Sequence, residues 1–244
     1  MVVMIVITGA GGKLGKELSM RFPGAAKPTR EELDVTDEKS VSNYMQSTSP
    51  QVVIHLAAMT SVTECEAEKE RAWKTNVTGT LNMAKASAKT GAYFVLMSTP
   101  CVFSGKGPFM EGDTPYPENF YGLTKLAAEI SVLAISTNSV IIRANFVPKE
   151  KWPYEGAFTD RWGTYLFAED LAKEIRKIID LRKTGVIHVA GDKTMSMYEL
   201  AKLCPDSEHV RAISYRKYLE NGGCRLTQDM TLDSNHWQKV KISV

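Results

Sequence analysis

The chain has 244 residues, of which 43% are hydrophobic and 24% charged, and its formal net charge is +2. This length suits one large α/β domain or a domain with a small lobe, and such a core needs neither disulfides nor metal ions. The small net charge is unlike the basic surface of a nucleic-acid-binding protein, so no nucleic-acid partner is expected.

Strand and helix patterns alternate along the first 145 residues. The β-branched run at 2–8 predicts a strand that is buried on both faces, and a helix follows at 12–21. The next expected elements are a weak strand at 24–28, a short capped helix at 34–47, a strand at 51–58, a helical stretch at 63–90, a strand at 91–99, a loop at 100–119, a helix at 120–136 and a strand at 139–144. Parallel strands need crossover helices, so this order predicts a doubly wound parallel sheet.

The remaining residues are less regular. An amphipathic helix is expected at 168–180, a strand at 185–191 and a helix at 196–204. Two Ser/Thr-x-x-Glu patterns, Thr63 to Glu66 and Ser196 to Glu199, predict capping boxes at helix starts. We therefore expect one domain at 1–145 and a small, shortened C-terminal lobe at 146–244, with a strand and a helix returning to the sheet.

Cysteine and histidine spacings predict no metal site. Four cysteines and four histidines lie far apart, without a CxxC pair or a ligand spacing typical of zinc. Free thiols in a reducing compartment are expected. The apolar run at the N-terminus ends at glycines after seven or eight residues and is too short to cross a bilayer. These features favour a cytoplasmic protein without a membrane partner.

The segment "TGAGGKLG" (8–15) lies between the first strand and the first helix, with glycines at Gly9, Gly12 and Gly15 and with Lys13 and Leu14 between them. A glycine turn at a helix N-terminus lets backbone N–H groups approach a pyrophosphate. The alternative is a tight strand-to-helix turn that binds nothing. The position after a buried first strand favours a dinucleotide site in a Rossmann-type sheet.

Two further segments are candidate cofactor contacts. Asp34 could accept a hydrogen bond from an adenine amino group while Val35 packs on the ring; alternatively, Asp34 is a helix N-cap, although Thr36 and Asp37 are better placed for that. Leu56 is followed by two small residues, Ala57 and Ala58. They would let a cofactor lie against the backbone, or let a helix pack closely. Ligands of open α/β sheets bind at such carboxyl ends of strands.

"YGLTK" (121–125) places Tyr121 and Lys125 on one helix face, and Ser98 and Thr99 end the preceding strand. A carbonyl oxygen between Thr99 and Tyr121 would receive a hydrogen bond from one and a proton from the other. We expect the Lys125 ammonium to lower the phenol pKa of Tyr121 and to bind the ribose of a nicotinamide cofactor. A Tyr-x-x-x-Lys pattern alone more often marks a pair of residues on a helix surface. The strand end at Ser98 and Thr99 and the upstream glycine turn favour the catalytic interpretation instead.

The sequence resembles the extended short-chain dehydrogenase/reductases, most closely the dTDP-4-dehydrorhamnose reductase-like branch. The matching stretches are "ITGAGGKLGKEL", "EELDVTD", "HLAAMTSVTECE", "NVTGTLNMAKA", "STPCVFSG", "FYGLTKLAAE" and "IIRANFV", with later ones as far as "RLTQDMTLDSN". The resemblance implies hydride transfer from NADPH or NADH to a nucleotide-linked 4-keto sugar in dTDP-rhamnose biosynthesis. It assigns Thr99, Tyr121 and Lys125 to catalysis, the glycines to the phosphates, and Asp34 and Val35 to adenine.

The expected cofactor is NADP rather than NAD. No acidic residue closes the second strand, where NAD specificity requires one for the ribose 2′-OH. Lys27 and Arg30 lie in that region and could meet a 2′-phosphate, or form a solvated loop.

Departures from the family leave alternatives open. Pro100 and Cys101 replace the usual Asp-Tyr, and only 101 residues follow Arg143. Trp152, Tyr154 and Trp162 could stack on a base or fill the core of a trimmed lobe. The alternatives to a reductase are an epimerase or dehydratase on the same scaffold, or a non-catalytic nucleotide-binding regulatory subunit. A homodimer is expected by analogy only.

Overall fold

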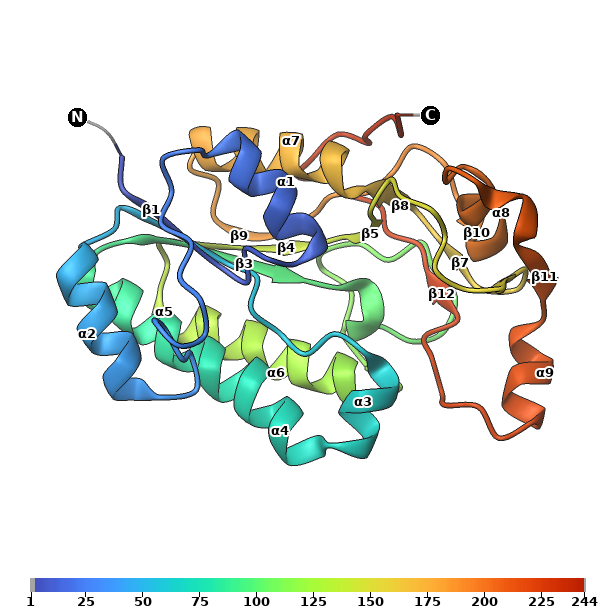
Figure 1. Ribbon diagram of the computed structural model, residues 1–244, viewed down its shortest axis with the longest axis horizontal. Helices are drawn as coiled ribbons and strands as arrows, with labels where there is room; N and C mark the ends of the chain where they lie inside the picture. The colour runs from blue at the N-terminus through green and yellow to red at the C-terminus, as the bar shows by residue number, and fades with distance from the viewer. Residues whose placement is uncertain (1–2, 244) are drawn as a thin grey trace.

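The computed structural model describes residues 3–243. Its centre is a five-stranded parallel sheet in the order β1-β2-β3-β4-β9 (Figure 1). The strands are β1 (Ile5–Thr8), β2 (Val52–His55), β3 (Tyr93–Ser98), β4 (Ser139–Arg143) and β9 (Gly185–His188). The α/β class and the Rossmann-type parallel sheet predicted from the alternation are therefore confirmed.

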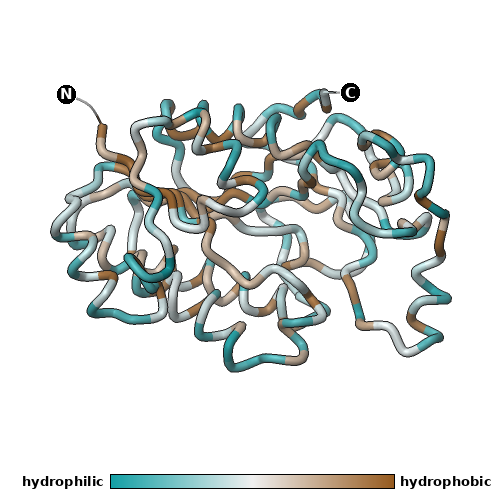
Figure 2. The backbone as a smooth tube through the Cα atoms, in the orientation of Figure 1, coloured by the Kyte–Doolittle hydropathy of each residue, from teal (hydrophilic) through white to brown (hydrophobic). Residues whose placement is uncertain are grey.

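The sheet is apolar on both faces because helices cover both. Every residue of β1 to β4 is buried, and the strands form the most hydrophobic part of the chain (Figure 2). The helices α1 (Lys13–Arg21) and α7 (Ala168–Asp180) pack on one face; α2 (Glu38–Thr48), α5 (Gly79–Thr90) and α6 (Phe120–Ile135) pack on the other (Figure 1). Each face has its own buried aliphatic cluster.

The expected weak strand at 24–28 reduces to one bridge. Ala26 pairs with β1 on the side away from β2, through hydrogen bonds of 2.9 Å from Ile7 N and 2.8 Å to Ile5 O. The chain thus moves from β1 to one neighbour at Ala26 and then to the opposite neighbour, β2. This reversal makes the carboxyl ends of β1 and β2 the switch point at which open α/β sheets bind ligands.

The helical stretch expected at 63–90 is divided. It contains α3 (Val62–Ala67), α4 (Lys69–Trp73), the π-helix η1 (Lys74–Thr78) and α5. The capping box predicted at Thr63 is wrong: Ser61 is the N-cap, and its hydroxyl accepts from Glu64 N at 3.3 Å. The Glu66 carboxylate instead accepts from Phe120 N at 2.7 Å, so it caps the start of α6.

The C-terminal lobe consists of short elements beyond the carboxyl ends of the strands (Figure 1). They are β5 (Asn145–Val147), β6 (Gly156–Phe158), β7 (Trp162–Gly163), β8 (Tyr165–Phe167), β10 (Met195–Ser196), α8 (Met197–Lys202), η3 (Ser207–His209), β11 (Arg211–Ile213), α9 (Tyr215–Glu220) and β12 (Asp229–Met230). The 3-10 turn η2 (Pro100–Val102) belongs to the loop that follows β3. The strands of the lobe pair as β10-β7-β12, β11-β6 and β5-β8. The capping box predicted at Ser196 and Glu199 is present at α8.

The C-terminal half also contributes to the central sheet. β9 pairs in parallel with β4, and α7 packs beside α1. Trp237 and Val240 pack against the same core cluster. Within residues 3–243, none of the helices combines the length and the apolar character that crossing a bilayer requires.

Candidate active site

A cavity of about 670 Å³ lies at the switch point between β1 and β2 and extends toward the C-terminal lobe. Most of the candidate residues predicted from sequence line it: Gly9, residues 12–15, residues 56–58, Thr99, Tyr121 and Lys125. These residues come from the ends of three strands, β1, β2 and β3, and from the N-terminal turns of the helices α1 and α6. The fold therefore brings the glycine turn and the Thr-Tyr-Lys set to one place.

The glycine turn packs too tightly for side chains. Gly9 has a φ of +68°, and a Cβ there would lie 2.8 Å from Ala57 N. A Cβ on Gly15 would overlap with backbone atoms of Gly9 and Ala10. Gly12 is the N-cap of α1 and offers no side-chain cap, so the first N–H groups of that nine-residue helix face the cavity end. This cradle fits the pyrophosphate of a dinucleotide.

The neighbouring rim after β2 is held by a buried threonine. Thr8 Oγ1 accepts hydrogen bonds from Leu56 N at 3.2 Å and Ala57 N at 3.3 Å. His55 Nδ1 lies 2.8 Å from the same oxygen, and burial, with a smaller effect of the Lys125 charge, lowers the pKa of His55 to about 3. His55 is therefore neutral and holds the rim in place rather than titrating near neutral pH.

Thr99 and Tyr121 meet at the end of β3. Thr99 is buried, and its hydroxyl accepts from Cys101 N at 3.2 Å where η2 begins. Tyr121 lies in the first turn of α6, whose N-cap Asn119 accepts from Gly122 N at 2.9 Å. The Tyr121 phenol lies close enough to the Thr99 side chain for that side chain to affect its pKa. A carbonyl oxygen entering the cavity can approach both hydroxyls.

The pKa of Tyr121 differs from expectation. Burial away from water raises this pKa well above its ordinary value; the nearby Cys101 thiol adds to the rise, and the Thr99 side chain opposes it. The expectation that Lys125 lowers the phenol pKa in the ligand-free protein is wrong, because desolvation dominates. The phenol therefore remains protonated over the physiological range and can donate its proton.

Lys125 is a buried cation in the cavity wall. The residue is only 4% exposed, and burial lowers the pKa of its ammonium group to about 8, while the Glu129 charge opposes that shift. Within residues 3–243 its ammonium group forms no ion pair. Its nitrogen is thus available to a ligand in the cavity.

A buried ion pair anchors α6 behind the cavity. Arg143 Nη2 lies 2.6 Å from Glu129 Oε2, and both side chains are at most 4% exposed. Ser98 donates a hydrogen bond to the other oxygen of Glu129, and Arg143 Nη1 lies 3.2 Å from His188 Nε2. The pair joins α6 to the ends of β3, β4 and β9. It thereby fixes the helix that carries Tyr121 and Lys125 against the strand that ends at Thr99.

Three predicted cofactor residues do not line the cavity. Val35 is buried in the core cluster that contains α2 and α5, where it packs against Gly79. The Asp34 carboxylate accepts from Thr36 N at 2.9 Å and from Thr36 Oγ1 at 2.8 Å. Arg30 is exposed, 3.9 Å from that carboxylate. Asp34 and Val35 could contact an adenine only at a surface outside this cavity. Most of the Val35 side chain is buried in the core and could not take part in such a contact.

Several lining residues were not predicted from sequence. They are Thr60, Val62, Met97, Ala144, Asn145, Phe146, Arg161, Met197 and Met230, whereas Ser98 and Cys101, which also line the cavity, were expected near it. Ala144 follows β4 directly, and Asn145 and Phe146 begin β5, so these three could have been found from the end of the predicted strand. Arg161, Met197 and Met230 come from the C-terminal lobe, and no spacing in the sequence marks them.

The aromatic residues considered for base stacking lie elsewhere. Trp152 is 5% exposed, and its Nε1 donates to Gly156 O at 3.2 Å, so it fills the core of the lobe. Tyr154 and Trp162 are exposed and do not line the cavity.

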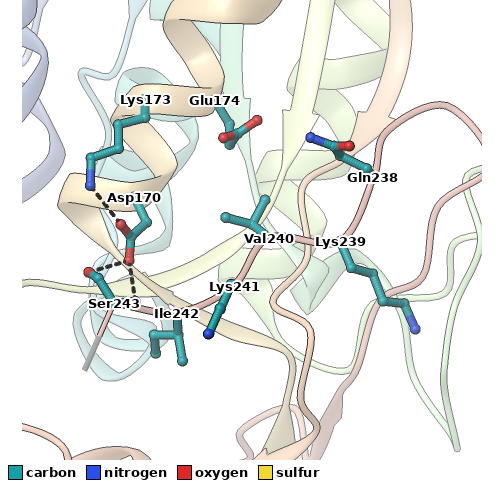
Figure 3. Close-up of a pocket in the computed structure, with 9 residues that line it drawn as sticks. All are labelled: Asp170, Lys173, Glu174, Gln238, Lys239, Val240, Lys241, Ile242 and Ser243. Carbon is teal, nitrogen blue, oxygen red and sulfur yellow. Dashed lines mark hydrogen bonds and ion pairs between the residues drawn. The ribbon is translucent and has the colours of Figure 1, made fainter.

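A second hollow of similar size, about 620 Å³, lies between α7 and residues 238–243 (Figure 3). Its carboxylates are already paired: Asp170 accepts from Ser243 N at 2.9 Å and from Lys173 Nζ at 3.0 Å (Figure 3). Glu174 pairs with Lys177 at 2.7 Å. None of the sequence-predicted site residues lines this hollow, so the cavity at the switch point is the stronger candidate.

Comparison with known proteins gives consistent findings. Residues 3–154 match the family described as the RmlD substrate binding domain. The dTDP-4-dehydrorhamnose reductase of Mycolicibacterium smegmatis is 32% identical over 81% of this chain and 67% of its own length. The methionine adenosyltransferase 2 subunit beta of Xenopus laevis is 30% identical over 86% of this chain and 75% of its own length.

A solved structure matches almost the whole chain. The crystal structure of dTDP-4-dehydrorhamnose reductase from Bacillus anthracis, in complex with NADP, superposes with a TM-score of 0.89. It is 27% identical and covers 99% of this chain and 95% of that one. The similarity therefore includes the C-terminal lobe as well as the sheet.

Proposed function

The chain belongs to the family of the RmlD substrate binding domain, within the extended short-chain dehydrogenase/reductases, and we propose that it reduces a nucleotide-linked 4-keto sugar. It is an NAD(P)-dependent oxidoreductase, as its similarity to dTDP-4-dehydrorhamnose reductases in sequence and structure indicates. The proposed substrate is of the dTDP-4-dehydrorhamnose type.

One observation carries the proposal. Thr99, Tyr121 and Lys125 line the same cavity as a glycine turn whose backbone suits a dinucleotide pyrophosphate. Reduction of a ketone needs a hydride donor on one side of the carbonyl carbon and a proton donor at its oxygen. The cavity provides a place for the first and, at Tyr121, a group for the second.

In the proposed mechanism, a nicotinamide cofactor would supply the hydride when bound, and the glycine turn and Lys125 would hold it in the cavity. Thr99 holds the carbonyl oxygen by a hydrogen bond, and Tyr121 transfers its phenolic proton to that oxygen, so the ketone becomes an alcohol. Lys125 stabilises the phenolate that remains, because its ammonium lines the same cavity and forms no ion pair with a carboxylate among residues 3–243. Its pKa of about 8 leaves most of it protonated at neutral pH.

NADP is the proposed cofactor in preference to NAD. Arg30 has a side chain that is 75% exposed and only a 3.9 Å contact to Asp34, so its guanidinium can turn to a 2′-phosphate. A comparison of kcat/KM for NADPH and NADH tests this preference. A higher value for NADH would reverse the assignment.

The test of the function is cofactor oxidation with a panel of dTDP-, UDP- and GDP-linked 4-keto sugars, followed by absorbance. Tyr121→Phe is expected to lower kcat by about 10²- to 10⁴-fold and to leave the Kd of NADPH unchanged, because only the proton donor is lost. A variant that turns over as fast as the wild type would remove Tyr121 from the mechanism.

A second candidate is a non-catalytic nucleotide-binding subunit, because the chain is also 30% identical to a methionine adenosyltransferase 2 subunit beta. Tight NADPH binding without turnover of any sugar in the panel favours that reading. An epimerase or a dehydratase would convert its substrate without net consumption of NADPH. The homodimer also stays a prediction.

A further inference from the structure

The start of α6 lies at a seam between the central sheet and the C-terminal lobe. The Tyr121 ring packs against the buried cluster of the lobe and also against a smaller cluster around Cys65. A Cβ on Gly122 would overlap with Cys101 O, so this turn has almost no clearance from the chain that follows Thr99. The position of the proton donor beside Thr99 therefore depends on how the first turn of α6 is held.

Two side chains hold this first turn. The Glu66 carboxylate, from α3, accepts from Phe120 N at 2.7 Å. Asn119 is the N-cap, and its Oδ1 accepts from Gly122 N at 2.9 Å. A serine or an aspartate would cap a helix equally well. The capping bond alone therefore does not account for an asparagine at this position.

The amide nitrogen of Asn119 reaches into the lobe. Nδ2 donates to Thr227 Oγ1 at 3.2 Å, and the two residues are 108 positions apart in the chain. Asn119 is 5% exposed and Thr227 is 1% exposed, so water does not compete for this bond. Nδ2 has no other acceptor among residues 3–243. One side chain thus joins the helix that carries Tyr121 to the lobe.

Thr227 is itself held firmly within the lobe. On one side of it, Tyr215 Oη in α9 donates to Leu226 O at 2.7 Å. On the other side, Trp162 N in β7 donates to Gln228 O at 2.9 Å. The Thr227 hydroxyl therefore keeps a fixed place relative to α9 and β7.

We propose that Asn119 is a positioning residue, through which Thr227 and the lobe set the place of the Tyr121 phenol. The inference rests on the proposed function, in which that phenol donates a proton. The cavity extends from the switch point of the sheet to the lobe, so a bond across the seam keeps the phenol in one position relative to both. Misplacement of a reacting group by about 1 Å can lower a rate by about 10²-fold.

Variants that separate the cap from the bond to the lobe test this proposal in initial-rate assays. Thr227→Val removes the hydroxyl with little change of shape, and Asn119→Ser keeps a capping oxygen but cannot reach Thr227. Both are expected to lower kcat by about 10- to 100-fold, with KM and the Kd of NADPH nearly unchanged. Thr227→Ser retains the hydroxyl and should restore kcat. The double variant should be no slower than the slower single variant, because both changes remove the same bond.

Thr164→Val is the matched control. Thr164 is a lobe residue, 4% exposed, and its hydroxyl accepts from Leu232 N at 3.0 Å. Its loss should lower the melting temperature without touching α6, and kcat should stay near the wild-type value. An equal fall of kcat in Thr164→Val and Thr227→Val would make the bond at Asn119 a merely structural one and overturn the proposal.

Amide hydrogen exchange of Gly122, measured by NMR, follows the same bond without any substrate. Thr227→Val should speed this exchange about tenfold or more, because an Asn119 side chain without its acceptor turns toward water and releases Gly122 N. Unchanged exchange and unchanged kcat overturn the inference even if 4-keto sugars are reduced, and so does faster exchange with unchanged kcat. Faster exchange without turnover of any sugar in the panel keeps the bond to the lobe but removes the proposed reaction, and with it the role of the phenol.

Discussion

Replacing Lys125 by methionine should make the protein more stable and inactive. The side chains are similar in length, so the change mainly removes a charge that is buried in the cavity wall. Burial lowers the pKa of Lys125 from its ordinary 10.5 to about 8. That difference corresponds to about 3 kcal/mol of destabilisation of the folded state while the lysine is protonated.

The pH dependence gives the direction of the effect. Below pH 8 Lys125 is protonated in both the folded and the unfolded protein, and the folded protein bears the whole penalty. Between pH 8 and 10.5 the unfolded chain binds more protons than the folded one, so wild-type stability rises with pH. Lys125→Met does not titrate there. Its advantage should be largest at pH 7, up to about 3 kcal/mol, and should disappear near pH 10.5.

Urea denaturation of cofactor-free protein, followed by circular dichroism at several pH values, measures this difference. Lys85→Met in α5 is the matched control, because Lys85 is exposed and its loss should change stability by less than about 0.5 kcal/mol at every pH. If Lys125→Met were less stable than the wild type at pH 7, the ammonium would have a stabilising partner. That result would refute the view that the buried Lys125 ammonium destabilises the folded protein.

Two further predictions concern the scaffold. Arg143→Met leaves the buried Glu129 carboxylate without its partner at 2.6 Å and should lower the free energy of unfolding by about 3–5 kcal/mol in urea titrations; a loss below 1 kcal/mol would contradict a tightly coupled pair. Gly15→Ala forces a methyl group against the backbone of Gly9 and should weaken NADPH binding at least tenfold, as measured by fluorescence titration. The control is Gly24→Ala, where a Cβ meets nothing within 4 Å, and this variant should bind NADPH like the wild type. Equal affinities in these two variants would exclude a phosphate cradle at the turn.

Local patterns predicted most of the fold. Continuous β-branched runs indicated the buried strands, and Ser196 with Glu199 correctly marked a helix start. The same type of pattern misplaced the start of the helix near Thr63, because Glu66 is drawn to Phe120 N, 54 residues away in the chain. A capping motif is a local signal, and a distant backbone donor can compete for its carboxylate.

Local sequence patterns were enough to predict the strand-helix order, the glycine turn and the shared helix face of Tyr121 and Lys125, since each depends on residues a few positions apart. Three other features became visible in the folded chain: Val35 is part of the core, burial raises the pKa of Tyr121, and Arg161 lines the cavity. Hydrogen-bonded periodicity is fixed by near neighbours. The desolvation of a group and the charges near it depend on residues from distant parts of the chain, so they can be read only from the folded structure.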